Sequence, residues 1–244
     1  MGYGMSYIED NGYLTFDGVK SSDYGVWING GGTFNAPARR YKEYEVPGRN
    51  GALTIDENAF AEADHIYPAF IARSFPANVE SFRNQLMSRT GYCRLTDTYH
   101  TDEFYRARYM SGLEVDVAPG GAGGSFNLTF RRDPRRFLLT GETVQTFTSS
   151  GTITNPTLYP SRPLIRVYGY GTLTIGSDVI TVASTSYSYI DIDSEIMDCF
   201  YGTTNVNNKV TFQSNDFPVL KPGNTGISKS GITKVEITPR WYRI

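Results

Sequence analysis

The side chains best suited to chemistry in this sequence are two histidines, two cysteines and two groups of carboxylates. His65 and His100 do not form a His-x-x-x-His pair, and Cys93 and Cys199 lie far apart with no Cys-x-x-Cys spacing. A zinc site would therefore require an unusual ligand set. The Gly-x-Ser-x-Gly sequence that would position a nucleophilic serine is absent. We expect no catalytic residue, no metal site and no cofactor, and the sequence leaves open whether the cysteines pair.

One group of carboxylates alternates along the chain. On an extended strand, Asp191, Asp193 and Glu195 would share one face, while Ile190, Ile192 and Ile196 would face the core. Such a face could bind calcium or carry acid and base groups. A calcium loop, however, requires a glycine where Ile196 stands and a carboxylate where Gly202 stands. A solvated strand face is therefore the simpler interpretation.

The second group of carboxylates comprises Asp97, Asp102 and Glu103. Two of them could in principle act as a general acid and a general base. Their neighbours favour a turn followed by a strand, so a hydrolase built on either group is the weakest hypothesis.

Length and composition define the elements that must position these groups. The chain has 244 residues, enough for one large or two ordinary domains, and is rich in Tyr, Phe and Gly. This composition favours strands, so we predict a mainly β protein. The net charge of −2 argues against binding to nucleic acid or to an anionic membrane. No membrane-spanning run occurs and the first ten residues lack a signal-peptide pattern, which indicates assembly in a cytoplasm.

One amphipathic helix is predicted near residues 78–89, in an N-terminal β domain of residues 1–140. Val79, Phe82, Leu86 and Met87 recur on one face. Asn78 is the expected N-cap. We place the domain boundary near residues 131–141, where the strand pattern gives way to charge and proline. Short strands at regular spacing then predict a β-sandwich or jelly roll over residues 141–244.

The most distinctive local pattern is a β-hairpin over residues 41–56. Two alternating runs flank Pro47-Gly48-Arg49-Asn50-Gly51, where proline and glycines favour a reversal of the chain. Arg49 would lie at the exposed tip, where a solvated turn is the ordinary interpretation. We predict a contact between subunits that includes Arg49, Asn50, Tyr44 and Val46.

Several segments together resemble the distal tail protein (Dit) family of long-tailed, non-contractile bacteriophages. The resemblance extends over nearly the whole chain in the same order. Its segments are Leu14-Thr15-Phe16-Asp17-Gly18, Ser22-Asp23-Tyr24-Gly25-Val26, Val46-Pro47-Gly48-Arg49-Asn50-Gly51, Phe130-Arg131-Arg132-Asp133-Pro134, Asn155-Pro156-Thr157, Pro163-Leu164-Ile165-Arg166-Val167-Tyr168-Gly169, Ile190-Asp191-Ile192-Asp193-Ser194-Glu195, Phe217-Pro218-Val219-Leu220-Lys221-Pro222-Gly223-Asn224 and Pro239-Arg240-Trp241.

This resemblance implies a structural virion component of the siphophage tail tip. It implies an N-terminal domain that forms a homohexamer ring and a C-terminal galectin-like sandwich. The ring would join the major tail tube protein to the tail-associated tip protein, and receptor-binding or baseplate proteins would attach outside. DNA would pass through the lumen without specific binding, and a mildly acidic protein would limit its adhesion.

The alternative function is a carbohydrate-binding adhesin that recognises cell-wall polysaccharide. Flat aromatic rings stack on sugar faces, and Tyr168, Tyr170, Tyr187, Tyr189 and Trp241 are the candidates. The same residues fit ordinary strand packing equally well.

Overall fold

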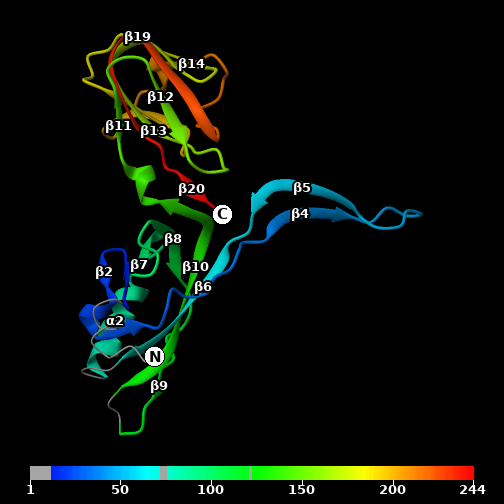
Figure 1. The fold of residues 1–244 in the computed structure, drawn as a ribbon, viewed down its shortest axis with the longest axis vertical. Helices are drawn as coiled ribbons and strands as arrows, with labels where there is room; N and C mark the ends of the chain where they lie inside the picture. Colours follow the sequence, from blue (N-terminus) through cyan, green and yellow to red (C-terminus); the bar gives the residue numbers. More distant parts are fainter. Residues whose placement is uncertain (1–11, 72–75, 121–122) are drawn as a thin grey trace. The chain divides into compact units, whose positions relative to one another are not determined.

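The computed structural model describes residues 12–71, 76–120 and 123–244. These residues are mainly β with one α-helix, which confirms the predicted fold class (Figure 1). The chain divides into two compact units, here called unit 1 (residues 1–136 with Ile244) and unit 2 (residues 137–243). The strand pattern does not give way at residue 131, because β10 runs from Gly124 to Leu138.

The main sheet of unit 1 has the strand order β2-β1-β7-β8-β10-β6-β3, and β9 pairs with β10. Its strands are β1 (Leu14–Phe16), β2 (Val19–Lys20), β3 (Val26–Ile28), β6 (Ala63–Ile71), β7 (Cys93–Asp97), β8 (Glu103–Tyr109), β9 (Asp116–Val117) and β10 (Gly124–Leu138). A short 3-10 helix, η1 (Ser21–Tyr24), precedes β3. Every second residue of β6 is buried, from Ala63 to Ile71, as expected for a strand with one face on a core.

Helix α2 (Ala77–Met87) packs on the core of unit 1. Phe82 and Leu86 are fully buried and Val79 packs beside them, as the periodicity predicts. Met87, predicted on the same face, is 60% exposed because it is the last helical residue. The helix begins at Ala77 after Pro76, so Asn78 lies inside the first turn and is not the N-cap.

Unit 2 is one curled sheet of short and long strands around its own core. The strand order is β11-β19-β13-β15-β16-β17, with β12 on β19, β14 on β13, and β18 on β14. These strands are β11 (Gln145–Phe147), β12 (Gly151–Asn155), β13 (Leu164–Ile175), β14 (Asp178–Val182), β15 (Ile190–Asp193), β16 (Asp198–Tyr201), β17 (Thr204–Asn205), β18 (Val210–Phe212) and β19 (Gly223–Thr238), and β20 (Tyr242–Arg243) follows them in the chain. Two further 3-10 helices occur, η2 (Leu139–Glu142) and η3 (Asn207–Lys209).

The two longest strands of unit 2, β13 and β19, pair antiparallel with two irregularities in their register. The register shifts on both sides of Gly169. Gly171 has a φ of 132°, and a Cβ added to it would lie 2.2 Å from the main-chain oxygen of Ser230. Only glycine permits this close approach of the two backbones.

We therefore expect Gly171→Ala to lower the free energy of unfolding of unit 2 by about 2 kcal/mol or more. Urea unfolding can be followed for each unit separately, because unit 1 contains Trp27 and unit 2 contains Trp241. The measurement uses Trp241 fluorescence in a Trp27→Phe background. Gly226→Ala, on β19 but with open space around the added Cβ, is the matched control. Equal urea midpoints for Gly171→Ala and Gly226→Ala would contradict the importance of the close backbone approach at Gly171.

Candidate functional site

The predicted hairpin is present as a separate two-stranded ribbon, here called the arm (Figure 1). Strand β4 (Arg39–Tyr44) pairs antiparallel with β5 (Leu53–Phe60). In the connecting loop, Gly48 and Gly51 both have a φ of 80°, and the N–H of Arg49 donates to the oxygen of Val46 at 3.1 Å. The local turn chemistry therefore forms the hairpin as predicted.

The arm carries apolar side chains that no other described part of the chain covers. All six residues of β4 are exposed. Tyr44 is 50% exposed, Leu53 42% and Ile55 49%. Tyr44 lies opposite Leu53, and Ile55 lies opposite Lys42, so these side chains share one face of the ribbon. An exposed apolar face of this kind is typical of a surface that contacts another protein.

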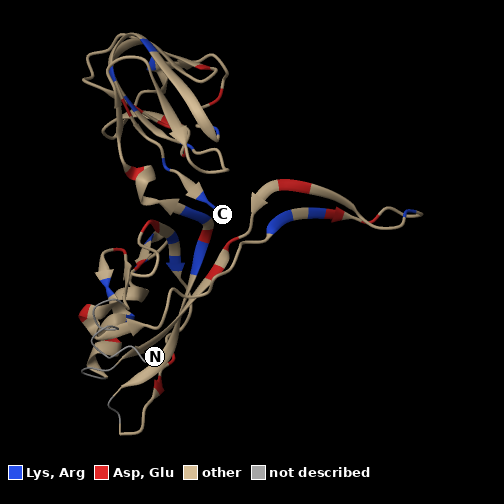
Figure 2. Cartoon of the chain, viewed as in Figure 1, with Lys and Arg blue, Asp and Glu red and all other residues tan. Residues whose placement is uncertain are grey.

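Charged residues surround this apolar face. Arg39 pairs with Asp56, and both Arg40 and Lys42 pair with Glu57 at 3.0 and 3.2 Å. Figure 2 shows the acidic and basic residues along both strands. The hydrogen bond from Arg39 lowers the pKa of Asp56 below its ordinary value. Such exposed pairs add little to stability, so their main effect is on solubility and on the choice of partner.

The four predicted contact residues gather at the distal half of the arm. Tyr44 ends β4, Val46 is 43% exposed, and Arg49 and Asn50 lie in the exposed loop. Sequence reasoning did not select Leu53 and Ile55, although they complete the apolar face. Their alternation with polar residues was visible in the sequence, but the partner strand that aligns them with Tyr44 was not.

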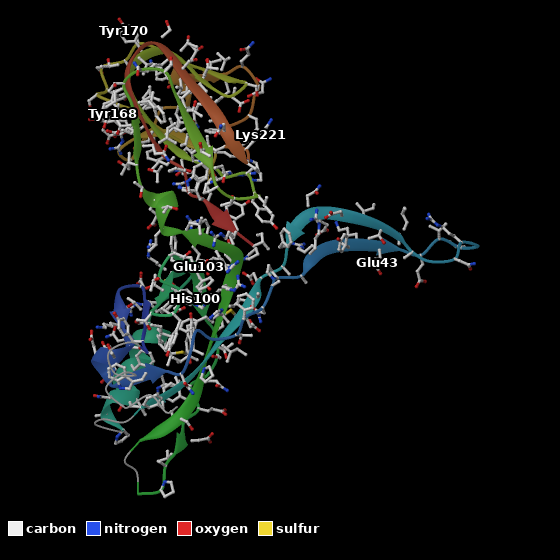
Figure 3. The ribbon with its side chains drawn as sticks, in the orientation of Figure 1. Glu43, His100, Glu103, Tyr168, Tyr170 and Lys221 are labelled. Carbon is white, nitrogen blue, oxygen red and sulfur yellow. The ribbon has the colours of Figure 1, made fainter. Side chains whose placement is uncertain are left out.

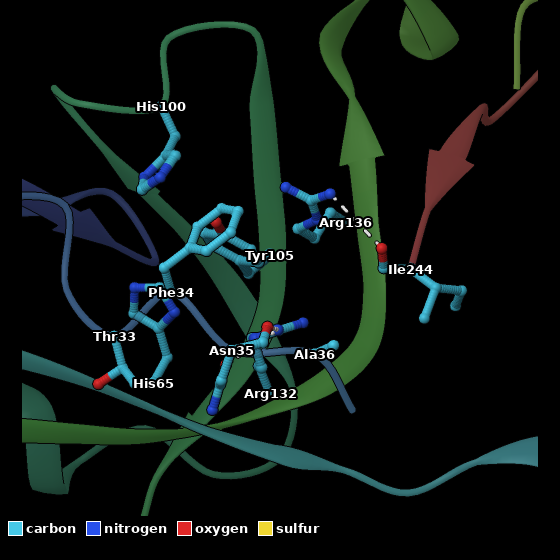
Figure 4. Close-up of a pocket in the computed structure, with 10 residues that line it drawn as sticks. All are labelled: Thr33, Phe34, Asn35, Ala36, His65, His100, Tyr105, Arg132, Arg136 and Ile244. Carbon is cyan, nitrogen blue, oxygen red and sulfur yellow. Dashed lines mark hydrogen bonds between the residues drawn. The ribbon is translucent and has the colours of Figure 1, made fainter. Parts of the chain in front are cut away.

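The two histidines, far apart in the sequence, meet in a small cavity of unit 1. The cavity has a volume of about 90 Å³, and Figure 4 shows the side chains that line it. The ring centroids of His65 and His100 are 6.3 Å apart, and Arg132 and Arg136 lie beside them. Their convergence was not predicted, because it depends on the strand order of the sheet.

Glycines allow the backbone to pass close over the histidines. The ring of His65 donates from Nε2 to the oxygen of Gly31 at 3.0 Å. A Cβ at Gly32 would lie 2.5 Å from the same nitrogen, and a Cβ at Gly31 would lie 2.6 Å from Cε1 of His100. The run of three glycines from Gly30 was the sequence signal that could have indicated this close approach.

The second carboxylate group forms part of the same region. Asp97 ends β7 and Glu103 begins β8, which confirms the predicted turn and strand. Asp97 accepts hydrogen bonds from Tyr67 at 2.7 Å and from His100 Nδ1 at 3.0 Å. Both carboxylates are buried.

The prediction of a solvated face for the alternating carboxylates is wrong. Asp191 and Asp193 are 4% and 6% exposed. Arg166 binds both oxygens of Asp191 at 2.7 and 2.8 Å, and Arg240 does the same for Asp193. Arginines cover the carboxylate face, which is why the strand can be buried on both sides. Ile196, predicted in the core, is 64% exposed in the turn that follows.

The aromatic candidates for sugar binding are mostly occupied by other contacts. Trp241 is only 3% exposed and belongs to the core. Arg166 lies 4.1 Å over the ring of Tyr189, and Lys234 lies 4.0 Å over the ring of Tyr168. Tyr170 is 58% exposed; Figure 3 labels it beside Tyr168 on unit 2.

Both cysteines are free thiols. Cys199 is buried, which raises its pKa to about 12; burial also raises the pKa of Cys93. Within the described ranges, no group of three or more His, Cys, Asp or Glu residues could hold a metal ion. No helix there is long and apolar enough to cross a membrane.

Comparison with known proteins identifies the fold. No family model and no curated protein matches the sequence. Among solved structures, the crystal structure of phage SPP1 Dit, described as a hub adsorption apparatus of phages that infect Gram-positive bacteria, matches with a TM-score of 0.68 and 14% identity. The match covers 95% of this chain and 99% of that one.

A second match is the phage P2 baseplate in its activated conformation with calcium. It has a TM-score of 0.50 and 10% identity, over 93% of this chain and 96% of that chain. At these identities the likeness extends to the fold. The resemblance read from the sequence is thus confirmed at the level of the fold, and the chain has a Dit-like fold.

Proposed function

We propose that this protein is a structural subunit of a phage tail hub and not an enzyme. Six copies form a ring at the distal end of the tail tube. The proposal is supported by the Dit-like fold, since the two similar structures are a hub protein and a baseplate, and by the exposed apolar arm. A repeated head-to-tail contact closes into a ring when one surface of each copy fits a different surface of the next.

The proposed neighbours follow the order of the tail. One face of the ring binds the major tail tube protein and the other binds the tail-associated tip protein. Receptor-binding or baseplate proteins attach to unit 2, and DNA passes through the lumen without specific contacts. The protein is assembled in the host cytoplasm and remains in the virion at the tail tip.

The observation that carries the ring proposal is the apolar face of the arm. Tyr44, Leu53 and Ile55 lie on one side of a ribbon that pairs with no other described strand. Removing these side chains from water would stabilise a contact by about 25 cal/mol for each Å² of apolar surface. Arg49, at the loop, would add a directional hydrogen bond to the neighbouring copy.

The test is the mass of the purified protein in solution, measured by mass photometry and sedimentation over a range of concentrations. Wild-type protein is expected to form hexamers. The triple variant Tyr44→Ser, Leu53→Ser, Ile55→Ser is expected to remain monomeric, and Arg49→Glu to raise the concentration at which rings form by about tenfold, as for the loss of one charged hydrogen bond.

The control replaces apolar residues outside the arm that are even more exposed. Met110 is 66% exposed and Leu158 is 87% exposed, so their replacement by serine removes similar side chains elsewhere. This control should assemble as wild type does. Rings that form normally from the triple variant, or a wild-type protein that stays monomeric at all concentrations, would count against the arm as the ring contact.

Two of the tyrosines of unit 2, Tyr168 and Tyr189, do not favour the adhesin alternative. A sugar stacks on a free ring face, whereas Arg166 and Lys234 cover faces of Tyr189 and Tyr168. Titration with cell-wall polysaccharide tests this directly, and a tail hub subunit should show no saturable binding.

A further inference from the structure

Arg132, on β10, is a buried cation that forms no ion pair with any described carboxylate. It is 2% exposed, although it carries a full positive charge. Its Nη1 donates to the main-chain oxygens of Asp133 and Pro134 at 3.4 and 3.3 Å, and its Nη2 donates to the main-chain oxygen of Asn35 at 3.0 Å and to the side-chain Oδ1 of Asn35 at 3.3 Å. Its Nε has no hydrogen-bond partner. Burial of a charge without a counter-charge is unfavourable.

Two buried carboxylates of this region, Glu103 and Asp97, are bound to other groups. Glu103 accepts hydrogen bonds from Arg136 at 3.3 Å and from the hydroxyl of Tyr105 at 3.0 Å. Asp97 is bound to Tyr67 and His100. Within the part of the chain that the structure describes, no carboxylate forms an ion pair with Arg132.

The cavity lies directly against this cation. Arg132, Arg136, Asn35 and both histidines line its wall, and its volume of about 90 Å³ exceeds the ~30 Å³ share of one water. His65 is also buried, and its Nδ1 has no partner. The wall therefore contains two guanidinium groups beside a space large enough for a small polar group (Figure 4).

We propose that this cavity binds a single carboxylate group, held by Arg132 and Arg136. A planar carboxylate accepts hydrogen bonds from a guanidinium group in the geometry that guanidinium favours, and it supplies the negative charge that Arg132 lacks. The carboxylate comes either from a free small acid or from an acidic side chain of a second copy of this chain. Phe34, at the rim, is 93% exposed and is available to contact either source.

The two histidines provide a site-specific readout, because the sequence contains only these two and both line the cavity. Full-length protein labelled with ¹⁵N at histidine is titrated with sodium acetate, and the ring signals are recorded by NMR. Sodium chloride at equal ionic strength serves as the reference. Saturable movement of a histidine signal by acetate, but not by chloride, is the expected result.

A pair of variants tests whether Arg132 is responsible. Arg132→Met should weaken acetate binding by about tenfold or more, as for the loss of a charged hydrogen bond. The matched control is Arg131→Met, because Arg131 is the neighbour on β10 and its side chain is 44% exposed and paired with Asp64. It should bind acetate as wild type does. The comparison of acetate with chloride in wild type requires no variant, so it stands even if Arg132→Met fails to fold.

Dilution without acetate distinguishes the two sources. A change of the histidine signals with protein concentration that wild type shows and Arg132→Met does not show indicates a carboxylate from a second copy. Signals that change only with acetate indicate a free acid. Either result supports the proposal. It is overturned if Arg132→Met responds to acetate and to dilution as wild type does, or if in wild type acetate acts no differently from chloride and dilution has no effect.

Discussion

Replacing Arg240 with methionine is expected to lower the free energy of unfolding of unit 2 by about 3–5 kcal/mol, because it leaves a buried carboxylate without its cation. Nη1 and Nη2 of Arg240 donate to the two oxygens of Asp193 at 2.7 and 2.8 Å, and the side chain of Asp193 is only 9% exposed. Burial alone would raise the pKa of Asp193, yet hydrogen bonds and charge from Arg240 lower it below its ordinary value. Urea unfolding followed by Trp241 fluorescence measures the loss.

The double variant Asp193→Asn, Arg240→Met is the control for this prediction. Asparagine keeps an oxygen for the N–H of Glu195, which donates to Asp193 at 2.9 Å, but it carries no charge to leave uncompensated. The double variant should therefore be more stable than Arg240→Met alone. If the double variant loses as much unfolding free energy as Asp193→Asn and Arg240→Met lose together, the two side chains are not coupled.

Acidification from about pH 7 to pH 4 is expected to remove about 3 kcal/mol of unit 1 stability through His65 alone. Burial lowers the pKa of His65 from 6.5 to about 4. Between these values the unfolded chain binds the proton and the folded chain does not, so stability falls as the pH falls below 6.5 and levels off near pH 4. Each pH unit in this window contributes about 1.36 kcal/mol.

The measurement is urea unfolding of unit 1 at a series of pH values, followed by Trp27 fluorescence in a Trp241→Phe background. His65→Gln is the comparison, because glutamine keeps an amide donor for the oxygen of Gly31 but does not titrate. Other groups titrate in both proteins. The difference between the two plots of unfolding free energy against pH therefore isolates the contribution of His65. Parallel slopes above pH 4 would contradict the assignment.

Elements determined by nearby residues could be predicted from the sequence. The hairpin follows from Pro47, Gly48 and Gly51, whose conformations depend on local sterics. The core face of α2 follows from the spacing of Phe82 and Leu86. Both lie where the periodicity places them.

Contacts between distant segments could not be predicted in the same way. The alternation of Asp191 and Asp193 places them on one face of β15, but it does not show what covers that face. Their partners lie 25 and 47 residues away along the chain. The ring centroids of His65 and His100 likewise lie 6.3 Å apart, although β8 and β10 separate β6 from β7 in the sheet. Strand order is set by the whole fold, which a local pattern does not encode.

The arm has a further consequence for a single copy of the protein. Because β4 and β5 pair only with each other, each has an outer edge whose N–H and C=O groups are open to any incoming strand. Such edges are templates for fibril growth. Arg40 and Lys42 on β4 and Glu57 on β5 are charged. A strand from another molecule would have to bury some of this charge when it pairs with the edge of the ribbon. These charges thus oppose edge-to-edge pairing between the ribbons of different copies.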